Sequence, residues 1–365
     1  MGRKGKRIKI LYTIPNFDTA GSGRVLYDLV KGLDPNKFDI SIACRHNRGS
    51  FFKEIDSLGL PIHFINTTVS LRPYLSLIFR VKPFRSFVKS HKFDIVHSWH
   101  WSSDWSEVLA TRMANSKFIY TKKAMSWGNI HWRIRSYLSN FIITINSEMQ
   151  SFFPNKKQQK LIPLGIDTDE FSPEHFNIKR EHKFKIITIA NLVPVKGVEV
   201  LIKSITKLTV EDIVLDIVGG GDEVYIAELK QLVSKLKLDS RVRFLGNQTD
   251  VRPFLAGAEL YVIPTLNEGR KEGMPMALVE AMSMQTMVLG SNISGINYVL
   301  KDFQDLLFPA NDSEVLSHKI LELYNKTEME RNALAMELRR YCVANFSMEA
   351  FIYAHEKLYQ QMVTY

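Results

Sequence analysis

The sequence predicts an α/β protein with two doubly wound domains, each built on a parallel sheet. With 365 residues, the chain exceeds what one hydrophobic core usually serves. Short β-branched runs alternate with helical patterns in the first half, and the same alternation restarts in the second half. A polar stretch, EHFNIKREHK at residues 174–183, separates the two series. We therefore place the domain boundary there.

Composition is that of a soluble globular protein, with 45% hydrophobic and 24% charged residues. No apolar run approaches the roughly 20 residues of a membrane span. The basic N-terminus precedes a short apolar run that ends without a small-residue cleavage site, so we interpret it as an exposed tail and expect a cytoplasmic protein. Cys44 and Cys342 show no metal-binding spacing and are expected to be buried, reduced thiols.

Charge is distributed unevenly along the chain. The net charge is +10, but residues 1–165 carry 26 Lys and Arg against 10 Asp and Glu, a net +16, while residues 166–365 carry −6. A basic first half and a mildly acidic second half indicate different partners for the two halves. Nucleic acid or an anionic membrane surface would each favour the first half.

The first domain opens with a strand at residues 8–14, a loop PNFDTAGSG and a helix RVLYDLVKGL. Gly21 and Gly23 invite comparison with the dinucleotide-binding fingerprint. The comparison fails, because Leu26 occupies the third glycine position and the second strand ends in Arg45 instead of an acid. A plain tight turn is the alternative interpretation of these two glycines.

Two later segments of the first domain mix aromatic and basic residues. Residues 73–90 form a basic amphipathic pattern that Pro83 would break or kink, and it suits either an anionic membrane surface or an ordinary helix with a solvated face. Residues 126–138 interleave tryptophans with arginines and could serve acceptor recognition, membrane contact or neither. Between them, a strand ending in His97-Ser-Trp-His100 reaches the carboxyl edge of the sheet, where open α/β folds bind ligands.

The most informative stretch is PTLNEGRKEGMPMALVEAMSMQ at residues 264–285. It follows a strand-like run and leads into a helix that opens at Pro275. A loop that feeds a helix N-terminus offers free backbone N–H groups and a positive dipole end to phosphate oxygens. Glu272 and Glu280 can accept hydrogen bonds from sugar hydroxyls, so the stretch suits a ligand that is part phosphate and part sugar.

The E-x7-E spacing with E-G-M-P resembles the signature of retaining glycosyltransferases of family 4, which have the GT-B fold. The resemblance implies that Glu272, with Gly273, Met274 and Pro275, addresses the donor sugar and its diphosphate, and that Glu280 holds the ribose. It also implies two Rossmann-like domains that face a cleft and close over the donor. We expect an acceptor domain at 1–168, a linker at 169–182, a donor domain at 183–346, and a C-terminal helix at about 347–365 that returns to the first domain.

Further motifs extend the resemblance over nearly the whole chain. Residues 165–173 match the linker pattern of the family. Lys196 and Gly197 resemble its K-G pair, in which the lysine neutralises the diphosphate. Residues 94–97 match the first four positions of its cleft motif D-V-V-H-x-H, with His97 as the first histidine. The other implied donor-binding positions are Gly21, Gly23, Gly219, Leu245 and Gly246; for Gly219 a simple turn is the alternative.

Two departures from the family pattern concern the predicted catalytic groups. Asn191 stands where the family usually has an arginine, so charge stabilisation rests on Lys196 alone or on a substitute, Arg270 or Lys271. Trp99 occupies the position of the second histidine in the cleft motif, which leaves His100, one residue later, as the candidate; a structural histidine at the sheet edge is the alternative interpretation.

The resemblance implies a retaining transfer of a sugar from a UDP- or GDP-linked donor to an acceptor hydroxyl, in polysaccharide or lipid-linked glycan biosynthesis. Lys196, Glu272 and His100 are the catalytic candidates. No metal ligands are visible, so we expect a metal-independent reaction without a cofactor. We expect a glycan or lipid-linked acceptor, a possible anionic membrane surface at the N-terminal domain, and no nucleic acid. The alternatives are a basic nucleic-acid- or membrane-binding protein with a degenerate site, and a sugar-nucleotide epimerase.

Overall fold

The computed structural model describes residues 7–18, 20–49, 51–177, 183–269 and 272–364. The chain forms two compact units. Unit 1 extends to Gly165 and takes up the chain again from Met348, and unit 2 comprises Ile166–Ser347. The sequence places the boundary of the first domain at residue 168, and the structure divides after Gly165.

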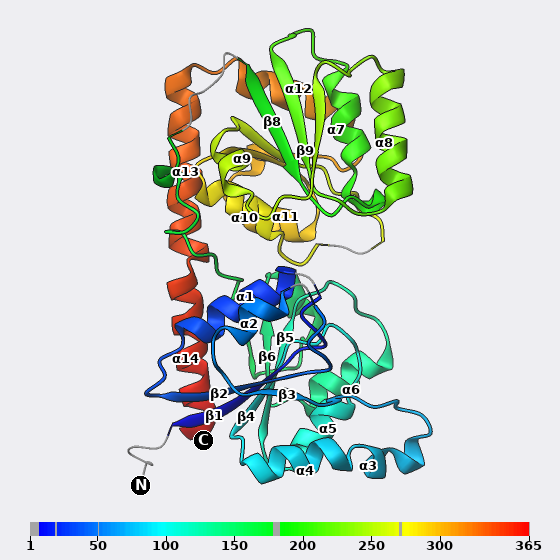
Figure 1. Cartoon of the computed structure of the whole chain (residues 1–365), viewed down its shortest axis with the longest axis vertical. Helices are drawn as coiled ribbons and strands as arrows, with labels where there is room; N and C mark the ends of the chain where they lie inside the picture. The colour runs from blue at the N-terminus through cyan, green and yellow to red at the C-terminus, as the bar shows by residue number, and fades with distance from the viewer. Residues whose placement is uncertain (1–6, 19, 50, 178–182, 270–271, 365) are drawn as a thin grey trace. The chain divides into compact units, whose positions relative to one another are not determined.

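Unit 1 is built on a seven-stranded parallel sheet with the order β3-β2-β1-β4-β5-β6-β7 (Figure 1). Its strands are β1 (Ile8–Thr13), β2 (Phe38–Cys44), β3 (Ile62–Phe64), β4 (Ile95–Ser98), β5 (Lys117–Lys122), β6 (Phe141–Thr144) and β7 (Gln159–Leu161). The chain winds outward from β1 in one direction and then from β4 in the other. The strand order therefore reverses between β1 and β4, and the loops after these two strands open at that point.

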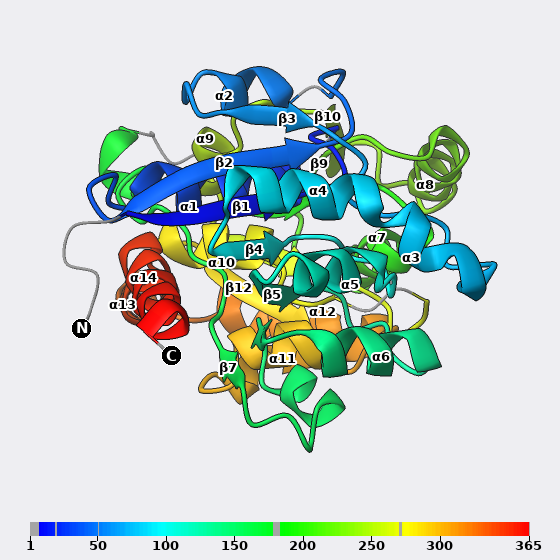
Figure 2. The same cartoon turned by 90° about the horizontal axis from the view of Figure 1, so that it is seen from below.

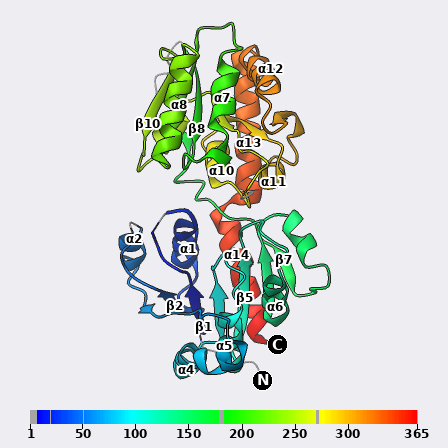
Figure 3. The same cartoon turned by 90° about the vertical axis from the view of Figure 1, so that its right-hand side faces the viewer.

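The helices of unit 1 cover this sheet, and Figure 3 shows α2 and α6 at opposite ends of the unit. They are α1 (Ala20–Gly32), α2 (Phe52–Asp56), α3 (Leu77–Arg80), α4 (Lys82–His91), α5 (Ser106–Met113), α6 (Ile130–Leu138) and α14 (Met348–Thr364), with single 3₁₀ turns η1 (Tyr74–Ser76) and η2 (Glu148–Phe152). The C-terminal helix α14 is fixed to the sheet by Tyr359, whose hydroxyl lies 2.7 Å from the hydroxyl of Tyr12 on β1 and 2.7 Å from Nδ1 of His97 on β4.

Two local predictions for unit 1 need correction. The expected loop over residues 15–23 is too long, because α1 already begins at Ala20 and contains Gly21 and Gly23. Residues 73–90 do not form one helix, since the segment divides into η1, α3 and α4 at Val81. Pro83 lies in the first turn of α4, where a missing N–H costs no helical hydrogen bond.

Unit 2 repeats the architecture with a six-stranded parallel sheet in the order β10-β9-β8-β11-β12-β13. The strands are β8 (Phe184–Ile189), β9 (Ile213–Val218), β10 (Val242–Gly246), β11 (Leu260–Ile263), β12 (Met287–Ser291) and β13 (Leu307–Phe308). The helices are α7 (Val198–Ile205), α8 (Glu223–Lys235), α9 (Arg252–Ala256), α10 (Met276–Ser283), α11 (Ser294–Val299), α12 (Ser313–Tyr324) and α13 (Glu328–Phe346), with 3₁₀ turns η3 (Pro173–His175), η4 (Pro194–Lys196) and η5 (Gln304–Leu306). Here the strand order reverses between β8 and β11.

The prediction of two doubly wound parallel sheets is confirmed. Strands β9 and β11 are buried along their whole length, which explains why both are largely apolar runs in the sequence. The one charged residue among them, Asp216 on β9, is paired with Arg243. None of the described helices combines the length and the apolar character needed to cross a bilayer. Cys44 and Cys342 are free and buried, and burial raises their thiol pKa values to about 11 and about 12.

Candidate functional site

The loops that follow β8 and β11 lie side by side at the carboxyl edge of the unit 2 sheet. The N–H of Leu266, after β11, donates to the carbonyl of Val195, after β8, at 2.9 Å. These two strands flank the point at which the strand order reverses. Open α/β sheets bind ligands at such points, so this edge is the candidate site in unit 2.

Lys196 is held at this edge by a tight backbone turn. It ends the 3₁₀ turn η4, and Gly197 follows in the left-handed region with φ +63° before α7 begins. A Cβ at Gly197 would lie only 2.2 Å from the carbonyl oxygen of Pro264. Glycine is therefore required here by both the dihedral angle and the close approach of the two loops.

Glu272 forms an ion pair with Lys196. The lysine side chain is 26% exposed and the glutamate side chain 17% exposed, so both groups are partly shielded but remain reachable from solvent. The structure thus brings together two of the three predicted catalytic residues. The pair joins the loop after β8 to the loop before α10.

The backbone after Glu272 is packed closely against α11. A Cβ at Gly295 would lie 2.7 Å from the carbonyl oxygens of both Glu272 and Gly273. Met274 is buried and anchors the segment. Pro275 is the N-cap of α10 and has no side-chain group with which to cap the first amides of the helix. The start of α10 therefore suits an anionic ligand group.

The second glutamate of the motif, Glu280, lies on α10 near the buried hydroxyl of Tyr261. Burial raises the pKa of Tyr261 well above its usual range, and the charges of Glu280 and Glu272 raise it further. Both carboxylates therefore lie close enough to the Tyr261 hydroxyl to raise its pKa. In the described part of the chain, the Tyr261 hydroxyl and the buried Thr265 Oγ1 have no hydrogen-bond partner. Neither residue is predicted from the sequence, although Tyr261 is the one hydroxyl side chain of an otherwise apolar strand and Thr265 follows the strand two residues after its end.

The glycines after β9 and β10 lie at the same edge of the sheet. Gly219 has φ +132°, and a Cβ there would lie 1.9 Å from the carbonyl oxygen of Ala190. Its N–H donates to the carbonyl of Gly246 at 2.8 Å. Gly246 itself has φ +67° in open space, and Leu245 beside it is half-buried. The segment is therefore a tight crossing of the loops that end β8, β9 and β10, and this closeness requires glycine at position 219.

In unit 1, His100 is enclosed in the loop after β4. Its side chain is 5% exposed, and Nε2 lies 3.0 Å from Thr67 Oγ1 and 3.8 Å from a Glu107 carboxylate oxygen. Burial lowers the pKa of His100 to about 4, although the charge of Glu107 opposes this. His100 is therefore neutral at pH 7. Gly21 and Gly23 lie in the first turn of α1, where a Cβ at Gly21 would meet nothing within 4 Å.

Glu107 and Arg135 form a fully buried ion pair beside His100. One Glu107 oxygen accepts from Ser98 Oγ at 2.6 Å and from an Arg135 nitrogen at 3.3 Å, and Thr13 donates to the other oxygen. Of the roles that residues 126–138 leave open, Arg135 has neither acceptor recognition nor membrane contact but a structural role. Its side chain is 0% exposed, because the fold supplies Glu107 from α5 as its partner.

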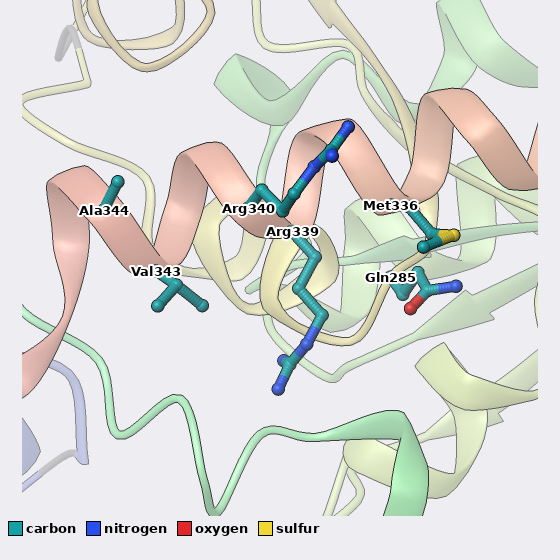
Figure 4. Close-up of a pocket in the computed structure, with 6 residues that line it drawn as sticks. All are labelled: Gln285, Met336, Arg339, Arg340, Val343 and Ala344. Atoms are coloured by element: carbon teal, nitrogen blue, oxygen red, sulfur yellow. The ribbon is translucent and has the colours of Figure 1, made fainter.

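A pocket elsewhere in unit 2 contains none of the predicted site residues (Figure 4). It is lined by Gln285, Met336, Arg339, Arg340, Val343 and Ala344. Arg339 belongs to a structural junction, since it donates to the carbonyls of Phe171 at 3.1 Å and Thr168 at 3.3 Å and thereby holds the chain that enters unit 2. The pocket lies beyond the C-terminal end of α10, whereas Glu272 precedes its N-terminus.

The proposed charge substitutes, Arg270 and Lys271, lie outside the described residues. Asn191, at the position of the usual family arginine, is exposed. Among the residues that the structure describes, no group of three or more His, Cys, Asp and Glu side chains is placed to hold a metal ion.

Comparison with known proteins identifies two family models that together cover most of the chain. The model described as Glycosyltransferase Family 4 matches residues 19–170, and the model described as Glycosyl transferases group 1 matches residues 171–337. The second match contains Lys196, Glu272 and Glu280.

Curated relatives and solved structures point in the same direction. The chain is 26% identical to N-acetyl-alpha-D-glucosaminyl L-malate synthase of Bacillus anthracis over 60% of this chain and 58% of that protein, so it spans little more than half of that relative. It is 24% identical to UDP-Gal:alpha-D-GlcNAc-diphosphoundecaprenol alpha-1,3-galactosyltransferase of Escherichia coli, over 94% of each chain. The structure of Anabaena HepE in complex with UDP-glucose superposes with a TM-score of 0.78 at 17% identity, covering 97% of this chain and 100% of that one.

Proposed function

We propose that this chain, which belongs to the glycosyl transferases group 1 and has the GT-B fold, transfers a sugar from a nucleoside diphosphate sugar to an acceptor hydroxyl. The observation that carries the proposal is the pairing of Lys196 with Glu272 at the point where the strand order of unit 2 reverses. A cation, a carboxylate and the start of α10 converge there. This is the set of groups that a ligand with both phosphate and sugar parts requires.

Lys196 stabilises the leaving diphosphate. As the bond between the sugar and the phosphate breaks, negative charge accumulates on the diphosphate oxygens, and a positioned ammonium group lowers the energy of that state. The backbone amides at the start of α10 serve the same charge. Glu272 accepts from donor sugar hydroxyls, and Glu280 from the ribose. No metal is needed for the departure of the diphosphate in this scheme.

The transfer proceeds with retention of the anomeric configuration. The acceptor hydroxyl attacks from the face that the diphosphate leaves, and a leaving phosphate oxygen takes the acceptor proton. The protein then need not supply a strong base. His100 accords with this scheme, because a buried imidazole with a pKa of about 4 is a weak base at pH 7.

A UDP-linked sugar is the first donor to test, because the Anabaena HepE structure holds UDP-glucose, and GDP sugars are the second. The acceptor is a glycan or lipid-linked glycan, in polysaccharide or lipid-linked glycan biosynthesis; the name of the Escherichia coli relative specifies a diphosphoundecaprenol acceptor. The +16 charge of residues 1–165 would hold the protein at the anionic cytoplasmic face of a membrane.

Calorimetric melting with UDP, GDP and ADP tests the donor site, because a ligand that binds only the folded state raises its stability. We expect one nucleotide to stabilise the protein, with and without EDTA, and the matching nucleotide sugar to be consumed with retention. Stabilisation by none of the three, together with salt-sensitive binding to RNA, would contradict the proposal and favour a nucleic-acid-binding protein. Conversion of the sugar nucleotide without transfer would favour an epimerase.

A further inference from the structure

Four exposed apolar side chains gather on η1 and α3 of unit 1, and we call them the apolar tip. Leu75 is 95% exposed, Phe79 75%, Ile78 57% and Tyr74 48%. The same segment already has a buried face, because Leu77 and the following Val81, Phe84 and Val88 belong to the core of unit 1. The tip is therefore a second apolar face, which the folding of unit 1 does not use. Contiguous exposed apolar surface of this kind marks an interaction site.

The apolar tip is presented on an ordered turn. Arg80 donates to the carbonyl of Pro73 at 2.6 Å and to that of Leu71 at 3.3 Å, which closes the turn behind the tip. The ring of Tyr74 stacks on that of Trp105 with centroids 6.3 Å apart. Figure 2 shows α3 at the outer edge of unit 1, beyond α5. The tip therefore lies at the edge of the unit on a turn that side-chain hydrogen bonds and ring stacking hold in place.

The chain segment that carries the apolar tip has charges of one sign. Residues 57–93 contain no Asp or Glu and six Lys or Arg. Four of these cations, Arg72, Lys82, Lys89 and Lys92, are exposed. Apolar side chains on a segment whose charged residues are all basic complement a bilayer that carries anionic headgroups over a hydrocarbon interior.

We propose that the apolar tip inserts into an anionic bilayer surface, and that the neighbouring cations bind the lipid headgroups. Charge alone would hold unit 1 near the membrane, but it would not account for exposed leucine, isoleucine and phenylalanine side chains on an ordered turn. Single-stranded nucleic acid would use flat rings for stacking, and two of the four tip residues are aliphatic. The proposed function supplies the purpose of the insertion, which is to bring unit 1 to a lipid-linked acceptor, and the insertion itself does not depend on it.

Flotation with vesicles of phosphatidylglycerol and phosphatidylcholine tests the proposal. The variant L75S/F79S should lower the vesicle partition coefficient at least about tenfold, because each side chain loses the free energy of transfer from water. The matched control is Tyr353→Ser, since Tyr353 is an exposed aromatic residue on α14 of the same unit. It should float like the parent protein. Equal loss in both variants, or none in either, would overturn the proposal.

A dye attached to the tip reports insertion directly. Both native cysteines are buried, so Leu75→Cys gives one accessible thiol for an environment-sensitive fluorophore. Anionic vesicles should shift its emission to the blue, and the same label at Tyr353→Cys should stay in water. An unshifted label at position 75 would contradict insertion. Insertion would also be contradicted if the parent protein dimerised through the tip and L75S/F79S floated as well as the parent. Stabilisation by UDP, which unit 2 provides, should be the same in L75S/F79S, so failure of insertion and failure of the donor site can be distinguished.

Discussion

The ammonium group of Lys196 and the carboxylate of Glu272 form an ion pair across 76 residues of sequence. Each group is predicted to bind a different part of the donor, yet in the ligand-free site each neutralises the other. A diphosphate that binds here must compete with Glu272 for Lys196. The pairing therefore keeps both side chains near their working positions before the donor arrives.

Replacing Lys196 tests whether this ammonium stabilises the leaving group. Lys196→Met should lower kcat about 10²–10³-fold, because the removed charge acts mainly on the transition state. The melting temperature should change little, since partly exposed ion pairs contribute about 0–1 kcal/mol. Lys203→Met, at an exposed position on α7, is the matched control and should retain full turnover. Equal kcat values for the two variants would remove Lys196 from the mechanism.

Glu272→Gln separates the two roles of the pair. Turnover should fall, because the sugar loses a charged hydrogen-bond acceptor. The affinity for UDP without a sugar should stay equal or rise, because Lys196 no longer has a competing carboxylate. Isothermal titration with UDP and a transfer assay with the UDP sugar measure the two effects independently. Weaker binding of UDP to the variant would show that Glu272 supports the diphosphate site and does not compete with it.

The glycines of unit 2 allow a second matched comparison. Gly197 and Gly246 have nearly the same φ, +63° and +67°, but only Gly197 has a close neighbour. A Cβ at Gly197 would lie 2.2 Å from the carbonyl oxygen of Pro264, whereas a Cβ at Gly246 would meet nothing within 4 Å. Gly246→Ala should cost about 1–2 kcal/mol of unfolding free energy for the left-handed conformation alone. Gly197→Ala should cost more, because the two loops must also separate. Denaturant unfolding followed by circular dichroism compares them, and equal losses would mean that the loops yield easily.

Much of this fold can be predicted from the sequence because most buried strands are short, largely apolar runs followed by a helical pattern. The start of α1 could not be predicted, because Gly21 and Gly23 favour a loop when only local preferences are considered. In the structure both lie in the first turn, where a Cβ at Gly21 would be free of contacts and would strain nothing.

Some residues of the site can be predicted from local motifs, and others depend on packing between distant segments. Glu272, Glu280 and Lys196 stand in short motifs that a sequence displays directly. The buried role of Arg135 depends on Glu107, a partner 28 residues away that only the packing of α5 against α6 supplies. Tyr261 likewise appears as an ordinary strand residue until α10 places Glu280 near its hydroxyl.

The buried histidines of unit 1 predict how its stability depends on pH. Burial lowers the pKa of His100 and of His355 to about 4, and that of His97 well below its usual value of 6.5. His100 faces Glu107, Arg135, Lys123 and Arg45, and the single carboxylate does not offset the burial. Below pH 6.5 the unfolded chain therefore takes up protons that the folded unit does not. The free energy of unfolding should fall as the pH falls, by up to about 1.4 kcal/mol per pH unit for each histidine.

Tryptophan fluorescence can follow this effect in unit 1 alone, because all five tryptophans of the chain lie between residues 99 and 132. Urea unfolding between pH 6.5 and 5.2 avoids most carboxylate titration and should show the steep fall. His355→Gln should reduce the slope, since it removes one of the buried imidazoles, whereas His318→Gln, at an exposed position of unit 2, should leave it unchanged. If the free energy of unfolding of the parent protein did not change over this pH range, the buried imidazoles would take up protons in the folded state as well. His100 would then be available as a base near pH 6.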